Sequence, residues 1–259
     1  MLVSDVFSYL DELAPFSYSM DFDNSGLLIG DPSQSVKKIL VALDCTKSVV
    51  SKAREMGADL IVTHHPVIFD PLKNVMVGSV PHQLICAGIS IICAHTNLDL
   101  ARGGVNDQLA RRLKLKCLEG LSPISCTDRN GNTVTEYLGR ISFLPEPLEP
   151  KQFACFVKER LGGNVRYVSG NRPVHRVAVC GGSGADCLAD AIHVGADALV
   201  TSEIKHHIFL LAAQQGITLV DAGHFHTEDV VIEPLCQQLR AAFPETEVLA
   251  YHLDEIRIL

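Results

Sequence analysis

Short apolar runs alternate along the chain with stretches whose apolar positions recur every three or four residues. The first pattern is typical of buried strands, and the second of helices that cover a sheet. In the first half, strand-like runs occupy 37–44, 58–63 and 89–94, and helix-like stretches occupy 46–57, 80–87 and 105–115. This alternation predicts an α/β fold with a mainly parallel sheet flanked by helices.

The second half of the chain repeats the alternation. Its strand-like runs are 176–182, 197–201, 217–222 and 247–251, and its helix-like stretches are 185–195, 203–216 and 228–243. The connecting part carries Asn130-Gly131, a pair that favours a tight β-hairpin turn. We therefore expect two similar α/β units, one over 1–125 and the other over 126–259.

Two pairs of segments indicate that one unit was duplicated. GADLIVTHHPVIF (57–69) resembles GADALVTSEIKHHIF (195–209), and GISIICAHTNLD (88–99) resembles GITLVDAGHFHTE (216–228). Parallel strands share the same buried chemistry, so part of this similarity is expected from the fold alone. Matched landmarks in the same order still favour duplication.

Composition narrows the class of protein. Hydrophobic residues make up 47% of the chain and charged residues 20%, which is typical of a globular protein. The net charge of −8, without any basic stripe, disfavours binding to nucleic acid. No apolar run reaches membrane-spanning length, and the N-terminus lacks the basic and apolar regions of a signal peptide. We therefore expect a cytoplasmic protein that does not bind membranes.

The nine cysteines favour buried, reduced thiols. Their number is odd and no CxxC pair occurs, which disfavours both a disulfide framework and a cysteine-based zinc site. The common nucleotide and hydrolase motifs, GxxxxGK[ST], GxGxxG after a strand, GxSxG and HExxH, are also missing from the sequence.

Histidines and carboxylates gather just past the carboxyl ends of three predicted strands. Ligands of open parallel sheets bind at this edge, on loops that the sheet holds in place. The candidate metal ligands in these positions are His64, His65, Asp99, His224 and Glu228, with His95 beside Asp99.

Adjacent histidines on an extended chain point to opposite sides. Pro66 keeps His65 extended, so a single ion would not easily take both His64 and His65. A pair of ions could take one imidazole each. The alternative is that the two histidines form a polar pair in a loop and bind no metal.

The two remaining pairs have an i, i+4 spacing. His95 with Asp99, and His224 with Glu228, would each lie on one face of a helical turn. There a carboxylate can bind or bridge metals, while the histidine binds a metal or orients a ligand. The alternative is helix capping by Asp99 or Thr227. Asp44 and Glu203 could face the same cleft, although capping is their default role.

The chain resembles the Nif-three-like family, whose bacterial members are usually labelled GTP cyclohydrolase 1 type 2 homologues. The resemblance spans most of the chain, and the combination of HHP, HTNLD and GHxxxE in this order is highly specific. The family usually has tryptophan where this chain has Phe22. The matching segments are DFDNSGLLIG (21–30), VTHHPVIF (62–69), AHTNLD (94–99), VTSE (200–203) and DAGHFHTE (221–228).

The resemblance implies two divalent metal ions per subunit, shared between the two units. The metal ligands that the resemblance implies are His64, His65, Asp99, His224 and Glu228, with Glu228 bridging both ions and His95 nearby. This donor set suits zinc, iron, manganese, cobalt or nickel. The resemblance also implies a homo-oligomer, a hexameric ring, whose metal sites face an internal cavity.

Two functions fit these expectations. The first is a metal-dependent hydrolase that acts on a nucleotide or another phosphorylated small molecule, since two ions would attract an anion and activate water. The second is a non-enzymatic metal-binding regulator, chaperone or scaffold. The sequence identifies neither the substrate nor a general acid or base.

Overall fold

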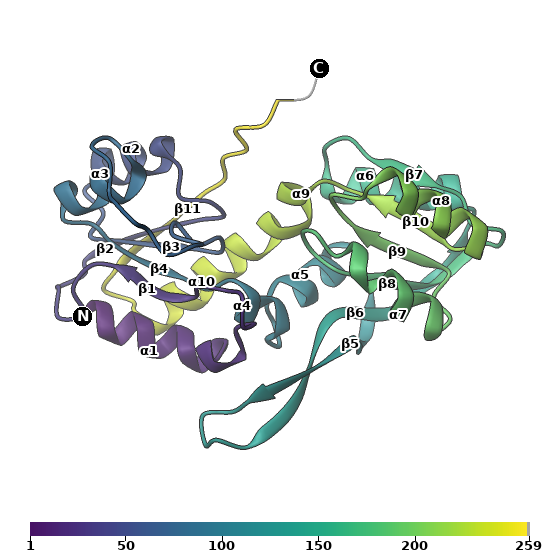
Figure 1. Cartoon of the computed structure of the whole chain (residues 1–259), viewed down its shortest axis with the longest axis horizontal. Helices are drawn as coiled ribbons and strands as arrows, with labels where there is room; N and C mark the ends of the chain where they lie inside the picture. Colours follow the sequence, from purple (N-terminus) through teal and green to yellow (C-terminus); the bar gives the residue numbers. More distant parts are fainter. Residues whose placement is uncertain (258–259) are drawn as a thin grey trace. The chain divides into compact units, whose positions relative to one another are not determined.

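The computed structural model describes residues 1–257 and contains two compact units, each with one sheet packed between helices (Figure 1). The first unit comprises 1–101, 127–132 and 232–255, and the second comprises 102–126, 133–231 and 256–257. The α/β class with two helix-flanked sheets, predicted from the alternation of apolar runs, is therefore confirmed.

The first unit has a five-stranded sheet in the order β1-β4-β3-β2-β11. Strands β4, β3, β2 and β11 are parallel, and β1 is antiparallel to β4 at one edge. The elements of this unit are α1 (Val3–Leu13), η1 (Phe16–Tyr18), β1 (Gly26–Ile29), β2 (Lys38–Ala42), α2 (Lys47–Met56), β3 (Leu60–Thr63), α3 (Val80–Ala87), β4 (Ser90–Cys93), α4 (Thr96–Leu100), α10 (Ile232–Ala242) and β11 (Glu247–Tyr251).

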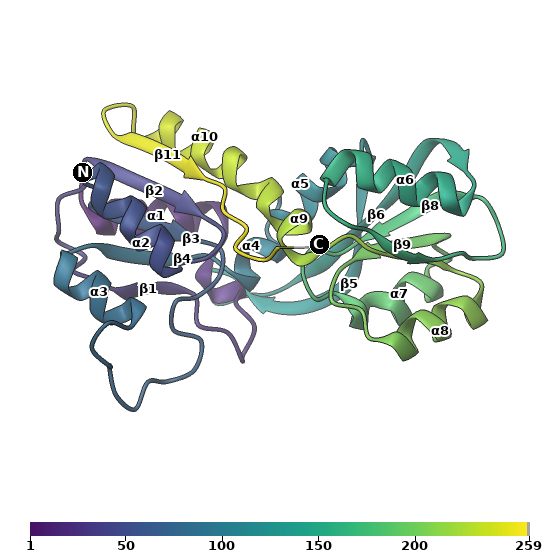
Figure 2. The ribbon, with the colours of Figure 1, turned by 90° about the horizontal axis from the view of Figure 1, so that it is seen from above.

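Helices cover both faces of the first sheet. Leu40, Ile61 and Ile91 point from the three central strands into a core that also contains residues of α2 and α3. Helices α1 and α10 lie on the opposite face (Figures 1 and 2). Strands β3 and β4 are buried at every position. Burial on both faces explains why their sequences are continuous apolar runs rather than alternating ones.

The second unit has a six-stranded sheet in the order β5-β6-β8-β9-β10-β7. The three central strands β8, β9 and β10 are parallel, whereas β6 and β7 pair antiparallel with their neighbours β8 and β10. The elements of this unit are α5 (Val105–Arg112), β5 (Lys116–Thr127), β6 (Thr133–Leu148), α6 (Pro150–Leu161), β7 (Arg166–Val168), β8 (Val174–Val179), η2 (Ala185–Cys187), α7 (Leu188–His193), β9 (Ala198–Thr201), α8 (His206–Gln215), β10 (Thr218–Asp221), α9 (His224–Glu228) and η3 (Asp229–Val231).

Alternating residues of β8 fill the two cores of this second unit. Val177 and Val179 pack with residues of α5 and α6, whereas Ala178 packs on the other face with residues of α7 and α8 (Figure 2). The long strands β5 and β6 form the hairpin that Asn130-Gly131 predicts, and Gly131 has a φ of +81° in its turn.

The two units share details that support the predicted duplication. Gly57 and Gly195 both have positive φ, +67° and +75°, immediately before β3 and β9. Two residues later, the Asp59 carboxylate accepts two backbone N–H groups at the start of β2, at 2.8 and 3.0 Å. The Asp197 carboxylate accepts two at the start of β8, at 3.1 and 2.8 Å. Equivalent carboxylates thus tie equivalent strands together.

The compact units differ in their bounds from the predicted division at residue 125. Helix α10 and strand β11 return to the first unit, where β11 pairs with β2 in parallel. Helix α5 and most of the β5–β6 hairpin belong instead to the second unit. An apolar strand pattern shows that a strand is buried but does not identify its partner strand, so it does not show in which unit a strand lies.

Within residues 1–257, none of the helices combines the length and the apolar character that crossing a bilayer requires.

Candidate functional site

Three histidines of the first unit form one group at the carboxyl end of its sheet. His64 and His65 follow β3, and His95 follows β4. Their ring centroids lie 5.0, 5.2 and 5.5 Å apart, and one nitrogen of each ring lies within 4.8 Å of the others. We call these residues the three-imidazole group. The parallel arrangement of β3 and β4 brings their loops to the same edge of the sheet.

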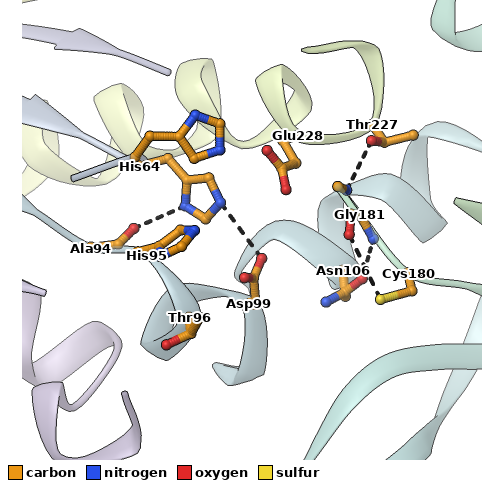
Figure 3. A network of polar contacts seen from close by, with 12 residues as sticks. His64, Ala94, His95, Thr96, Asp99, Asn106, Cys180, Gly181, Thr227 and Glu228 are labelled. Atoms are coloured by element: carbon orange, nitrogen blue, oxygen red, sulfur yellow. Dashed lines mark hydrogen bonds and ion pairs between the residues drawn. The ribbon is translucent and has the colours of Figure 1, made fainter. Parts of the chain in front are cut away.

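Hydrogen bonds fix how His64 and His65 present their nitrogens. His64 Nδ1 donates to the carbonyl oxygen of Ala94 at 2.9 Å, and His65 Nδ1 donates to Asp44 Oδ1 at 2.7 Å. Both partners are acceptors, so the partners assign the proton to Nδ1 and leave Nε2 with its lone pair. Figure 3 shows His64 between Ala94 and Asp99, with its Nε2 at 3.7 Å from Asp99 Oδ1.

Asp23 orients His95 in the same way. Its carboxylate, inaccessible to solvent, accepts His95 Nδ1–H at 2.7 Å together with bonds from the Asn24 and Thr96 backbone and the Ser25 and Thr96 hydroxyls. Burial alone would raise the pKa of Asp23, but the bonds from His95, Thr96 and Ser25 outweigh it and hold the pKa well below its usual range. Asp23 therefore remains ionised and keeps His95 fixed.

The second unit repeats this arrangement with one histidine. His224 begins α9, its Nδ1 donates to Glu203 Oε1 at 2.9 Å, and its Nε2 lies 2.9 Å from Glu228 Oε2. Glu228 is buried, with 4% of its surface exposed. Glu203 occupies the position that His65 has in the first unit, and its φ of +54° is strained for a residue other than glycine.

A glycine turn after β8 leaves room for these side chains. The Gly181 N–H donates to Asn106 Oδ1 at 2.9 Å (Figure 3). The Gly182 N–H donates to Thr227 Oγ1 at 3.0 Å. A Cβ at Gly182 would overlap Glu228 Oε1 and lie 3.2 Å from His224 Nε2. Only glycine fits here without displacing the carboxylate.

The donors suit divalent transition metals. Imidazole Nε2 atoms and carboxylate oxygens are the ligands of zinc, iron, manganese, cobalt and nickel, and a metal-binding histidine almost always donates its other nitrogen to a carboxylate or carbonyl. His64, His65, His95 and His224 all meet this second condition. The residues present therefore fit such ions.

The structure decides between several roles that the sequence left open. Asp99 lies inside α4, whose N-cap is His95, and Thr227 lies inside α9, so neither caps a helix as the alternative proposed. Asp44 and Glu203 orient histidines rather than cap strands.

The predicted ligands fall into two groups, each within one unit. His64, His65 and Asp99 belong to the first, and His224 with Glu228 to the second. Sequence reasoning missed Asp23, whose DFDNSG segment was noticed only for its resemblance. The sequence did offer a signal for this role. Asp23 is followed by Asn24 and Ser25, and Asp and Asn side chains in such turns often accept hydrogen bonds from nearby groups.

Comparison with known proteins finds relatives along nearly the whole chain. The model of the Duf34/NIF3 (NGG1p interacting factor 3) family matches residues 1–256. A Clostridium perfringens protein named GTP cyclohydrolase 1 type 2 homolog is 32% identical, covering 93% of this chain and 92% of its own. A Streptomyces coelicolor protein of the same name is 35% identical, covering 98% and 86%.

Solved structures show the same fold. The hypothetical protein SA1388 of Staphylococcus aureus has a TM-score of 0.92 at 30% identity, over 100% of this chain and 99% of that one. Reduced HcgD from Methanocaldococcus jannaschii has a TM-score of 0.80 at 27% identity, over 98% of both chains. With the family model spanning nearly the whole sequence, this chain belongs to the Duf34/NIF3 family.

Proposed function

We propose that the chain binds two divalent metal ions through its two ligand groups acting together. His64, His65 and Asp99 would supply the donors of the first unit, and His224 and Glu228 those of the second. One observation carries the proposal: each of these histidines has Nδ1 bound to an acceptor, which leaves Nε2 as the metal-binding atom. Glu228, with two oxygens, is the proposed bridge.

We further propose that the metal-loaded protein is a hydrolase. Two divalent ions would supply a Lewis acid that activates water and polarises the bond to be cleaved. They bring four positive charges, and Asp99 and Glu228 return two negative ones, so the centre would attract an anionic substrate such as a nucleotide. Relatives named GTP cyclohydrolase 1 type 2 homolog support this class.

The cellular compartment and the oligomeric state of the protein are also part of the proposal. The odd number of cysteines, without a CxxC pair, favours the reducing cytoplasm. The family resemblance favours a homo-oligomer, with a hexameric ring as the expected form. Sedimentation analysis of the purified protein would measure the oligomeric state directly.

Metal content followed by activity tests the proposal. The protein would be purified without chelator, analysed for metals, and screened against nucleotides and phosphoesters with the same metal restored. We expect about two ions per chain in the wild type. Glu228→Gln should lower the content of both ions because it removes the charge of a bridging ligand. His207→Ala, at an exposed histidine of α8, is the matched control.

Three results would contradict parts of this proposal. Equal metal content in the wild type and Glu228→Gln would exclude the bridging role. Loss of metal in His64→Ala without any loss in His224→Ala would show that the two groups bind separately. Full metal loading with no hydrolysis of any substrate screened would favour the non-enzymatic regulator, chaperone or scaffold instead.

A further inference from the structure

Two phenyl rings of the first unit stand exposed beside the three-imidazole group. Phe22 is 63% exposed and Phe69 is 47% exposed. Their ring centroids lie 6.4 Å apart, and the Phe69 centroid also lies 6.4 Å from that of His95, with the two rings nearly perpendicular at 77°. Large exposed aromatic side chains that gather at one place mark binding surfaces more often than isolated ones do.

Partly buried hydrogen bonds anchor the backbone next to both rings. Phe22 directly precedes Asp23, whose carboxylate is fixed by His95 and Thr96. Phe69 directly follows Ile68, whose carbonyl oxygen accepts Asn24 Nδ2–H at 2.6 Å. The same DFDNSG segment therefore orients an imidazole and anchors the backbone beside each ring. A surface that is ordered before binding loses less entropy when a ligand binds to it.

We propose that Phe22 and Phe69 form a binding surface for a planar, unsaturated ring of the substrate. The proposal rests on the proposed hydrolase function and names the part of the substrate that lies beside the metals. Phenyl faces favour offset or edge-to-face contact with another aromatic ring, beyond the general burial of apolar area. An aliphatic chain would gain only the latter.

Phe69 also lies beside the three-imidazole group, with its ring centroid 6.4 Å from that of His95. Aromatic contact places two ring centroids about 4.5–7 Å apart, so a ring that packs on the side of Phe69 facing His95 would lie next to this group. We therefore expect a substrate whose reacting group is attached close to its ring.

Two metal-binding probes that differ in one ring test this inference. Acetohydroxamate and benzohydroxamate bind divalent ions through the same atoms, but only the second carries a phenyl group. Calorimetric titration of the zinc-loaded, full-length protein gives the dissociation constant of each. We expect the preference for benzohydroxamate to fall about 3- to 10-fold in Phe22→Ala and in Phe69→Ala. Acetohydroxamate binding and zinc content should stay unchanged.

Two control variants make the result specific. Phe69→Tyr keeps an aromatic face and should retain the preference. Val77→Ala removes an 87% exposed apolar side chain from the same loop between β3 and α3, and should also retain it within about twofold. An equal loss in Val77→Ala would indicate general apolar contact with the loop and would overturn the aromatic surface.

The remaining outcomes separate this inference from the function on which it rests. If wild type binds both hydroxamates and the ratio is unchanged in both alanine variants, the ring surface is wrong while the metal site stands. If neither hydroxamate binds zinc-loaded wild type, the metal site is wrong and the ring surface falls with it. A change of oligomeric state in Phe22→Ala without any change in the ratio would make the rings a subunit contact instead.

Discussion

Replacing Gly182 with alanine would place a methyl group against the ligand pair of the second unit. The Cβ would overlap Glu228 Oε1, lie 3.0 Å from Glu228 Cδ, and lie 3.2 Å from His224 Nε2. Gly182 also has a φ of +59°, so alanine adds backbone strain as well. The two effects are separable, because only the first acts on the proposed metal ligands.

The expected magnitudes follow from these contacts. Left-handed backbone costs a residue with a Cβ about 1–2 kcal/mol of folding free energy. Carbon atoms pack at about 3.5–4.0 Å, so the Glu228 carboxylate must retreat by at least about 0.5 Å. Metal–ligand distances tolerate only about 0.2 Å. We therefore expect metal affinity to fall about 10- to 100-fold, the range seen when ligands lose their correct placement.

Competition with a chromophoric chelator measures the affinity, and urea unfolding of the metal-free protein measures the strain. Gly57→Ala is the matched control, since Gly57 has a φ of +67° and nothing within 4 Å of its added Cβ. It should lose similar stability yet bind metal like wild type. Wild-type metal affinity in Gly182→Ala, within about twofold, would refute the role of this glycine in placing Glu228.

Three further predictions concern Asp197, the cysteines and the histidines of the proposed metal site. Asp197→Asn should lower the free energy of unfolding at pH 7. Burial alone would raise the pKa of Asp197, but bonds from the Arg176 and His175 backbone and from Arg172 hold it below its usual range. The difference in free energy of unfolding between wild type and the variant, measured by urea unfolding, should therefore be present above about pH 4 and shrink as pH falls through the lowered pKa. A constant difference down to pH 2 would contradict this. Alkylation of the folded protein, followed by mass spectrometry, should label the exposed Cys86, Cys117 and Cys155 first. Burial raises the pKa of Cys45, which lies beside Asp44, and that of Cys236 to about 12, so these thiols should react slowly. Early labelling of Cys236 would show that its core opens. With free metal held low, metal occupancy should fall between pH 7.5 and pH 5, because only neutral imidazole binds metal, and unchanged content after equilibration at pH 5 would argue against histidine ligands.

Local sequence signals predicted much of the secondary structure. Thr46 and Gly57 were expected to bound a helix, and the hydroxyl of Thr46 accepts the Val49 N–H while Gly57 closes α2 in left-handed geometry. The continuous apolar runs around β3 and β9 are strands buried at every position. These features depend on neighbouring residues, so a single sequence contains the information that determines them.

Features that depend on distant residues were harder to predict. Asp23 lies 72 positions before His95 in the sequence, and no spacing rule connects an aspartate with a histidine over that distance. The antiparallel strands β1 and β7 are short edge strands whose burial pattern is weak. The histidine and carboxylate clusters themselves were visible, because each lies within five residues of sequence just after a buried strand.

The return of β11 to the first sheet determines the order in which the protein can fold during synthesis. Strand β11 pairs with β2, and the contact between Thr46 and Glu255 that follows these strands joins residues 209 positions apart. At about 5–20 residues per second, a ribosome needs roughly 10–40 s to make that intervening chain. The second unit, apart from its last residues, is synthesised within this interval and can fold first. Until β11 is made, β2 is an open edge of the N-terminal sheet, and an open edge can pair with a strand of another chain.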